Sequence, residues 1–382
     1  MLGIMVISAA GSMAGAQETT SDSASESPEV VRLLDALRRY REIAATGGWP
    51  AIPPGPTIRP GSRDPRIRAL IERLEVVGDL QTSGAANIDY DEDLQSAVRD
   101  FQSRHGLEPD ALVGPATLRA LNVSARERVQ QLERNLPRAR DVFTQTRKNF
   151  VLVNVPAFEA YLYRDGDMVW KTGVVVGHAE TETPLLESDV RSVVLNPTWT
   201  VPRSIASEEL LPKIQADVDF LSRGDYDVLD ADRQIVDPTS INWEELTANN
   251  FPYTLVQRPG PNNELGRIKF LFPNEYSVCM HDTPSKYLFS HYSRAFSHGC
   301  IRVEQPVDLA IRLLAEEGVS RDHINASLST VETEIVKLAD PVPIVLAYLT
   351  ATVDHTGSVH FLRDIYDSDA PDAGGAGSAV ER

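Results

Sequence analysis

Apolar residues recur along this chain at two different intervals. Before residue 149 they lie three or four positions apart, the spacing of one helix face, and afterwards they alternate with polar residues. Residues 29–46 predict an amphipathic helix, ended by Gly47-Gly48, with inward positions at Val30, Val31, Leu34, Leu37 and Ile43. Residues 49–63 complete this first region; their proline-rich part, with its tryptophan and isoleucines, predicts a rigid extended scaffold packed against a neighbour.

A compact helical unit is predicted over residues 64–123. Two amphipathic helices and a short third one, beginning near Gly114, carry inward apolar residues at Ile67, Leu70, Ile71, Leu74, Leu94, Val98, Phe101, Leu118 and Leu121. Residues 124–148 predict a long, mostly polar helix that connects this unit to the rest of the chain. The N-terminal part is therefore expected to be helical throughout.

Residues 149–366 predict a β-rich unit. Strands are expected over residues 150–155, 158–163, 169–176, 190–195 and 267–272, with a hairpin turn at 164–167 and a helix over 305–317. Residues 197–265 interrupt the strands with a predicted helix over 207–216 and many Asp, Asn, Gly and Pro residues, and an excursion this long usually has a function. The fold class is α+β and multidomain, with a β-rich core, attached helices and a small three-helix bundle before it.

Both ends of the chain differ from its middle. Residues 1–16 are uncharged and apolar and end in small residues before Gln17, which predicts a signal peptide, although no Lys or Arg precedes the apolar run. The run is short against the roughly 20 residues that span a bilayer, and we expect no other transmembrane segment. Residues 17–28 and 367–382 are small and polar, and we expect a disordered tether and a disordered tail.

Composition narrows the class of partner. The formal net charge of −18 argues against nucleic acid held by phosphate contacts and against a basic membrane-binding patch. The hydrophobic content of 42% is that of a globular protein with a real core. Because the chain has only two cysteines, the fold cannot depend on a disulfide framework.

The candidate chemistry is concentrated in residues 279–302. Both cysteines and three of the eight histidines lie within residues 279–300. A cysteine attacks as its thiolate, which needs a nearby base or a positive field at neutral pH. His298 and Arg302 each lie two positions from Cys300, so an extended segment projects all three to one side, while His281 comes from a second strand. The pattern predicts cysteine-based acyl transfer.

The same side chains allow a second interpretation. Cys279 and His281, together with His298 and Cys300, offer two sulfurs and two nitrogens to a tetrahedral zinc ion. Zinc would consume the nucleophile and would leave the Arg302 guanidinium repelling the metal. We therefore expect no metal site and no cofactor, and metal analysis beside activity after chelation separates the two interpretations.

Two sequence patterns resemble known families. Ser297-His298-Gly299-Cys300-Ile301-Arg302, preceded by His281-Asp282-Thr283-Pro284, resembles the signature of L,D-transpeptidases with a YkuD-type catalytic domain. Residues 196–202 resemble the start of the insertion that caps the substrate cleft in the larger Gram-negative subfamily. Residues 90–118 resemble the three-helix peptidoglycan-binding module of cell-wall enzymes, with Ala111 where that module usually has glycine. Whether this bundle binds glycan or only supports its neighbour stays open.

The resemblance assigns roles within the candidate site. It implies Cys300 as nucleophile, His281 as general base oriented by the main-chain carbonyl of Asp282, and a pocket shaped by His298 and Arg302. The N–H groups around Gly299 and Cys300 are expected to form an oxyanion hole, where the absence of Cβ lets backbone approach substrate. The substrate-binding residues implied are Trp199, Ser297 and Thr283, although core packing is an equal alternative for Trp199.

Cys279 departs from the pattern of that subfamily, which usually has tyrosine two residues before the histidine. If residues 277–281 form a strand, Cys279 and His281 share a face and a second thiol lies near the nucleophile. Two interpretations remain: a small buried residue that fills space, or a regulatory thiol that forms a reversible disulfide with Cys300.

The resemblance implies a function in the cell wall. The expected reaction is L,D-transpeptidation, in which a Cys300 thioester joins a donor tetrapeptide stem to an acceptor stem in a 3→3 cross-link, and acylation by carbapenems. Alternatives at the same site are L,D-carboxypeptidase activity with water as acceptor and anchoring of wall proteins. A non-catalytic peptidoglycan-binding protein is a further alternative. The expected partners are peptidoglycan stem peptides, and the expected location is the periplasm.

Overall fold

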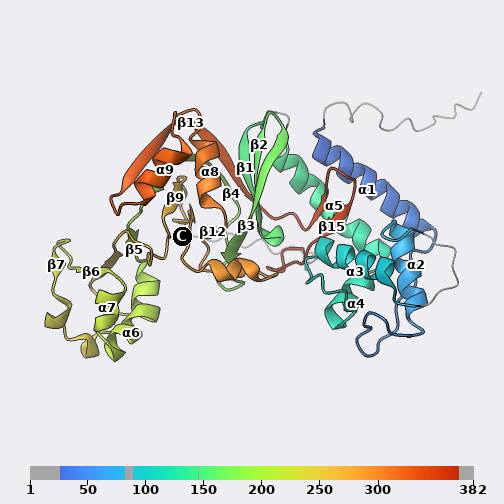
Figure 1. Cartoon of the computed structure of the whole chain (residues 1–382), viewed down its shortest axis with the longest axis horizontal. Coiled ribbons are helices and arrows are strands. Elements are labelled where there is room, and N and C mark those ends of the chain that lie inside the picture. Colours follow the sequence, from blue (N-terminus) through green and yellow to red (C-terminus); the bar gives the residue numbers. More distant parts are fainter. Residues whose placement is uncertain (1–25, 82–88, 145, 370–382) are drawn as a thin grey trace, which may run out of the picture.

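A computed structural model describes residues 26–81, 89–144 and 146–369 (Figure 1). The predicted signal peptide, most of the tether and most of the tail lie outside these residues. Along the longest axis of the molecule, a helical body lies at one end, a β barrel in the middle and an insertion from the barrel at the other end (Figure 1). No helix among the described residues is long and apolar enough to cross a membrane.

The helical body is built from α1 (Pro28–Ala45), α2 (Ile67–Val77), α3 (Glu92–Arg104), α4 (Pro115–Leu121) and α5 (Ala125–Val142). Side-chain caps fix where three of these helices begin, with Asp91 as the cap of α3. The Ser27 hydroxyl accepts from the Val30 N–H at the start of α1, and Ser124 and Glu127 form a capping box at the start of α5. Ordered structure therefore begins inside the predicted tether, and α5 ends six residues before the predicted boundary at residue 148.

Helices α2, α3 and α4 enclose one apolar core, as the spacing predicts. The proline-rich segment packs against it through Ile52 and Ile58, and Ile58 forms a β-bridge with Val113. Ala111 has φ +59°, a left-handed conformation that favours glycine. The Tyr90 hydroxyl donates to the Ala111 carbonyl at 2.6 Å, so tertiary contacts hold alanine in the turn.

The barrel is a single mixed sheet. Within the described residues it contains nine strands in the order β11-β3-β12-β10-β9-β4-β13-β1-β2, and β3 also pairs with β2, which closes the sheet on itself. The strands are β1 (Phe150–Asn154), β2 (Glu159–Arg164), β3 (Asp167–Gly177), β4 (Leu186–Leu195), β9 (Ile268–Leu271), β10 (Met280–His281), β11 (Ala295–Ser297), β12 (Ile301–Val303) and β13 (Glu334–Ala347).

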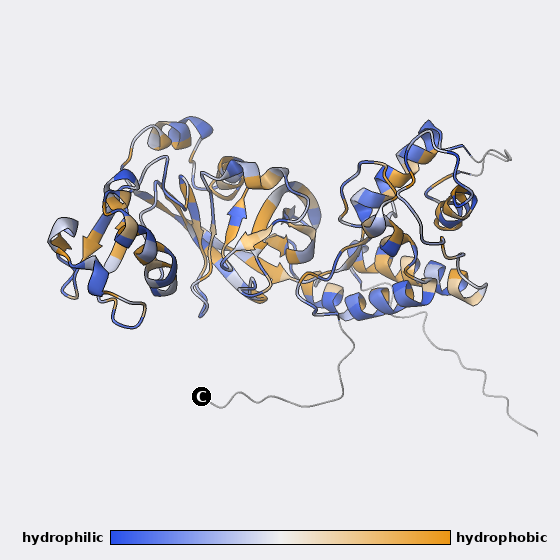
Figure 2. Ribbon diagram, turned by 90° about the horizontal axis from the view of Figure 1, so that it is seen from below, coloured by the Kyte–Doolittle hydropathy of each residue, from blue (hydrophilic) through white to orange (hydrophobic). Residues whose placement is uncertain are grey.

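Apolar side chains fill the barrel because successive strand residues point to opposite faces. Figure 2 shows hydrophobic residues concentrated in the strands and hydrophilic residues along the outer helices. Helices α8 (Pro306–Leu313) and α9 (Arg321–Leu328) cover the barrel core, to which they contribute Leu309, Ala310, Leu313 and Ile324. The predicted α+β class is confirmed.

The insertion folds around its own core. It contains a π-helical turn η3 (Ile205–Leu210), α6 (Leu211–Ala216), α7 (Asp219–Arg223) and a small sheet of β5 (Trp199–Thr200), β8 (Thr254–Gln257), β6 (Tyr226–Leu229) and β7 (Ile235–Val236). Short 3₁₀ turns lie at Pro238–Ser240 and Trp243–Glu245. The Arg267 guanidinium donates to Asn196 Oδ1 at 2.7 and 2.9 Å, which joins the two ends of the insertion where they leave the barrel.

Several predicted boundaries are wrong. The helix expected over 207–216 begins two residues earlier and is π-helical in its first part, and the helix expected to reach residue 317 ends at Leu313. Only Met280–His281 form a strand within 277–281. Within the predicted tail, the Asp369 carboxylate is buried and pairs with Arg138 at 2.5 Å.

The chain ends by returning to the helical body. Strands β14 (Ala351–Val353) and β15 (Val359–Phe361) form a hairpin whose apolar side chains pack with those of α1 and α5. The Arg104 guanidinium on α3 donates to the Val359 carbonyl at 3.1 Å. The helical body therefore contains chain from both ends of the sequence.

Candidate active site

Three neighbouring strands bring the candidate residues together. In the registers of β9, β10 and β12, His281 lies between Lys269 on one side and Arg302 on the other. Cys279 lies beside Cys300, since the Ile301 N–H donates to the Cys279 carbonyl at 2.9 Å. Because residues two apart in a strand share a face, the two thiols, His281 and Arg302 project from the same side of the sheet.

His281 is almost fully buried, and its Nδ1 lies 2.5 Å from the carbonyl oxygen of Asp282. A carbonyl only accepts, so Nδ1 carries the proton and Nε2 keeps a free lone pair. Burial and the Arg302 guanidinium lower the pKa of His281 from 6.5 to about 4. His281 is therefore a neutral imidazole near pH 7, with the tautomer that a general base needs.

The Asp282 side chain fixes the backbone that orients His281. Its carboxylate accepts from the Arg267 N–H at 2.8 Å and from the Lys286 ammonium at 2.5 Å. Gly266 leaves room for this carboxylate, because a Cβ there would lie 2.4 Å from Asp282 Cγ. The main-chain carbonyl of Asp282 thus faces His281, and the Asp282 side chain braces the start of β9.

The sulfur atoms of Cys279 and Cys300 lie 3.8 Å apart, and both cysteines are free. Cys279 is buried, whereas Cys300 is partly exposed. The hydrogen bond with Cys279 lowers the pKa of Cys300 to about 7 against the effect of burial, and Lys269 and Arg302 add to this. Cys300 is therefore partly ionised at neutral pH.

A tight turn presents Cys300. The Ser297 hydroxyl donates to the Cys300 carbonyl at 2.6 Å and accepts from the Gly299 N–H at 3.2 Å. Gly299 has φ +104°, and its carbonyl accepts from the Thr183 hydroxyl at 2.9 Å. The Gly299 N–H, which is expected to contribute to an oxyanion hole, is thus bonded to Ser297 in this structure.

Arg302 has unused hydrogen-bonding capacity. Among the described residues, its Nε is buried without a hydrogen-bond partner. An unpaired buried donor is costly in the free protein, so a ligand that accepts from it gains that energy on binding. Arg302 lies opposite His281 in the register of β10 and β12, and its positive charge acts on both His281 and Cys300.

His298 pairs with a residue of the insertion. Its Nε2 lies 2.9 Å from Oε1 of Glu209, which belongs to η3 in the insertion, and its ring packs edge-on against His178. This contact joins the insertion to the nucleophile turn. Sequence reasoning missed Glu209, and also Lys269, because neither lies in a motif.

The structure shows the contacts of the three residues predicted to bind substrate, Ser297, Thr283 and Trp199. Ser297 and Thr283 are each 1% exposed and bond within the turns that hold them. Trp199 packs on the core of the insertion, with its ring 6.5 Å from that of Tyr226.

The zinc arrangement is not formed. His298 faces Glu209, and Nδ1 of His281 faces a carbonyl. Within the part of the chain that the structure describes, no group of three or more His, Cys, Asp or Glu side chains could hold a metal ion.

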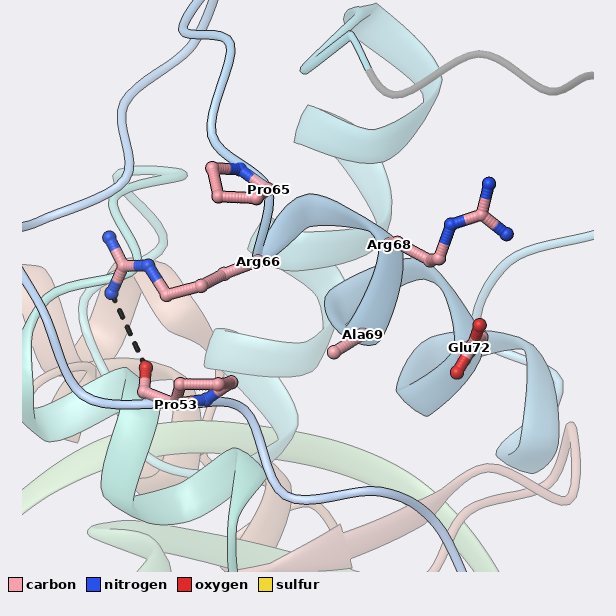
Figure 3. A pocket seen from close by; sticks show the side chains of 6 residues that line it. All are labelled: Pro53, Pro65, Arg66, Arg68, Ala69 and Glu72. Atoms are coloured by element: carbon pink, nitrogen blue, oxygen red, sulfur yellow. Dashed lines mark hydrogen bonds between the residues drawn. The ribbon is translucent and has the colours of Figure 1, made fainter.

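A hollow of about 380 Å³ lies on the helical body, lined by Pro53, Pro65, Arg66, Arg68, Ala69 and Glu72 (Figure 3). The Arg66 guanidinium is already engaged by Asp64 and by the carbonyl of Pro56. Arg68 points away from Arg66 (Figure 3), so the two cations do not converge on one ligand.

The barrel and its histidine-cysteine strands match a known class of catalytic domain. Residues 148–344, just over half of the chain, match the family YkuD, described as "L,D-transpeptidase catalytic domain". Residues 63–121 match a second family, described as "Putative peptidoglycan binding domain". The chain therefore belongs to the YkuD L,D-transpeptidase family, and the resemblance in its sequence is confirmed.

Individual proteins and solved structures are similar to only part of this chain. A Haemophilus influenzae protein named "Putative L,D-transpeptidase" is 38% identical over 221 residues, which cover 58% of this chain and 45% of that protein. The chain thus spans less than half of that relative's length. An L,D-transpeptidase structure from Stackebrandtia nassauensis is 15% identical, with 77% of this chain and 97% of that chain covered and a TM-score of 0.30. The Enterococcus faecium catalytic domain is 14% identical, with 53% and 99% covered and a TM-score of 0.26.

Proposed function

We propose that this protein is a peptidoglycan L,D-transpeptidase that forms 3→3 cross-links through a Cys300 thioester. The observation that carries the proposal is the pairing of β10 with β12. It sets a neutral histidine, with a free Nε2, on the strand next to a cysteine whose pKa is lowered to about 7. A base and a readily ionised thiol side by side are the requirement for nucleophilic catalysis by cysteine.

The proposed chemistry follows from these groups. The Cys300 sulfur attacks the carbonyl carbon of the amide before the terminal D-Ala of the donor stem, and Nε2 of His281 takes the thiol proton. The resulting imidazolium gives that proton to the departing amine of D-Ala, which leaves a thioester. An acceptor side-chain amine then attacks the thioester and loses a proton to His281, and the thiolate leaves.

The neutral state of His281 leaves its Nε2 able to accept the thiol proton, and its lowered pKa favours the return of that proton. Because burial and Arg302 make the imidazolium unstable, the proton returns readily to a leaving group. Arg302, with its unpartnered Nε, is the proposed contact for a carboxylate of the stem peptide. The N–H of Cys300 is the proposed donor to the oxyanion that forms when the sulfur attacks a carbonyl. Because the same donor would serve when Cys300 attacks a carbapenem, we expect carbapenems to be acylating inhibitors.

Two alternatives share this site. Water as acceptor makes the protein an L,D-carboxypeptidase, and a protein amine makes it a wall-anchoring enzyme. The match of residues 63–121 supports retention on peptidoglycan by the helical body and a location in the periplasm. A protein that binds the wall without catalysis is the remaining alternative.

The deciding experiment uses purified tetrapeptide muropeptides with mass spectrometry of the products. Cross-linked dimers with release of D-Ala support the proposal, tripeptides alone select the carboxypeptidase, and unchanged substrate selects the non-catalytic protein. We expect Cys300→Ala to lower D-Ala release by at least about a thousandfold.

Two controls separate catalysis from binding and folding. Cys300→Ala should still sediment with sacculi, because the helical body is intact. His291→Ala changes an exposed histidine in the loop before the nucleophile and should retain activity, whereas His281→Ala should not. Unchanged D-Ala release by Cys300→Ala would overturn the assignment of the nucleophile.

A further inference from the structure

We infer that Cys279 is a positioning residue for catalysis, whose thiol donates a hydrogen bond to the sulfur of Cys300 and stabilises its thiolate. The inference rests on the proposed role of Cys300 as nucleophile. It gives the second cysteine a function in the reduced enzyme, in place of the tyrosine that the resemblance leads one to expect.

The geometry is fixed by the sheet and not by flexible loops. Cys279 directly precedes β10 and Cys300 directly precedes β12, and these strands run parallel with Met280 opposite Ile301. The Ile301 N–H bonds the Cys279 carbonyl at 2.9 Å, which locks the register at the two cysteines. The separation of 3.8 Å between their sulfurs is a hydrogen-bonding distance for a thiol.

The surroundings decide which sulfur keeps the proton. Cys279 is 7% exposed and stands between the buried side chains of Val278 and Met280. Its hydrogen bond with Cys300 and its burial raise the pKa of Cys279 well above the usual value. Cys300 is more exposed, and both Lys269 and Arg302 lower its pKa, whereas of these two only Lys269 lowers that of Cys279. Cys279 therefore remains a thiol and acts as the donor.

The hydrogen bond from Cys279 matters because the surroundings of His281 disfavour its protonated form. Burial first, and then Arg302 and Lys269 on the two neighbouring strands, make an imidazolium unfavourable at His281, although the hydrogen bond to the Asp282 carbonyl opposes them. Moving the proton from Cys300 to His281 must therefore be assisted at the sulfur. Cys279, Lys269 and Arg302 are the groups that provide this assistance.

The test measures the ionisation of Cys300 without any substrate. Alkylation of Cys300 by iodoacetamide is followed between pH 5 and pH 10 by mass spectrometry of the Cys300 peptide. The proteins compared are the wild type, Cys279→Val, which keeps the volume without a donor, and Cys279→Ser, which restores one. We expect Cys279→Val to raise the pKa of alkylation by about one pH unit, hence about tenfold slower alkylation at pH 6, with little change at pH 10.

Each outcome bears on the inference. Recovery of most of the shift in Cys279→Ser supports hydrogen bonding, since packing loss alone would not be repaired by a hydroxyl. The same alkylation pKa in Cys279→Val and the wild type would overturn it, as would preferential alkylation of Cys279 in the wild type. Because no muropeptide is used, failure of the proposed cross-linking reaction is observed separately.

Discussion

Replacing His281 by glutamine should remove a large part of the acid sensitivity of this fold. His281 is 4% exposed, and burial together with Arg302 and Lys269 lowers its pKa from 6.5 to about 4. In the unfolded chain the same histidine takes up its proton near pH 6.5. The unfolded state therefore binds more protons between these two values, and stability falls as the pH drops through that window.

The size of the effect follows from the two pKa values. One pH unit between folded and unfolded pKa values corresponds to about 1.4 kcal/mol, so His281 alone costs about 3 kcal/mol of unfolding free energy on acidification to pH 4. His105 is also buried, with a lowered pKa, and acts in the same direction. It contributes equally to both proteins, so it cancels in the comparison.

Urea unfolding followed by circular dichroism at pH 7.5, 6.5, 5.5 and 4.5 measures this difference. The wild type should lose about 2 to 3 kcal/mol more than His281→Gln across the series. The exposed His291→Gln is the matched control and should follow the wild type. Parallel pH dependences for the wild type and His281→Gln would refute the claim that His281 is held neutral by its site.

Two further predictions concern contacts around the nucleophile. Mild oxidation by oxidised glutathione should join Cys279 and Cys300 in a disulfide that silences the enzyme, because their sulfurs lie 3.8 Å apart. Mass spectrometry of the unreduced protein should then show a mass lower by two hydrogens. Two free thiols after this treatment would exclude the switch. Glu209→Gln should raise KM by at most about fivefold with little change in kcat, because its half-exposed pair with His298 holds the insertion at the nucleophile turn. Glu208→Gln is the control on the same turn, and equal KM values in all three proteins would contradict this role.

Local signals made much of the fold predictable. The helix that became α1 has regular apolar spacing and two glycines after it, so its predicted and observed bounds differ by one residue at each end. Strand β13 escaped prediction because Pro341 and Pro343 argue against a strand inside a sheet. The structure accommodates them near an irregularity in the register between Lys337 and Val342.

The candidate site, like the fold, is predictable from local sequence only in part. The spacing of Cys300 and Arg302, and of Cys279 and His281, is short enough for sequence to place each pair on one strand face. The contact of His298 with Glu209 joins residues 89 positions apart, and Lys269 reaches the site only because β9 pairs with β10. Such contacts depend on the order of strands in the sheet, which periodicity does not encode.

The C-terminal hairpin sets the order in which this protein can finish folding. During synthesis α1 and α5 are complete long before Val359 and Phe361 exist, yet these residues belong to the same apolar cluster as Val30 and Leu132. The helices of this body are thus made well before the hairpin that completes their core. A chain cut after residue 344, where the catalytic match ends, would leave the helices at the opposite end of the sequence with an uncovered apolar face.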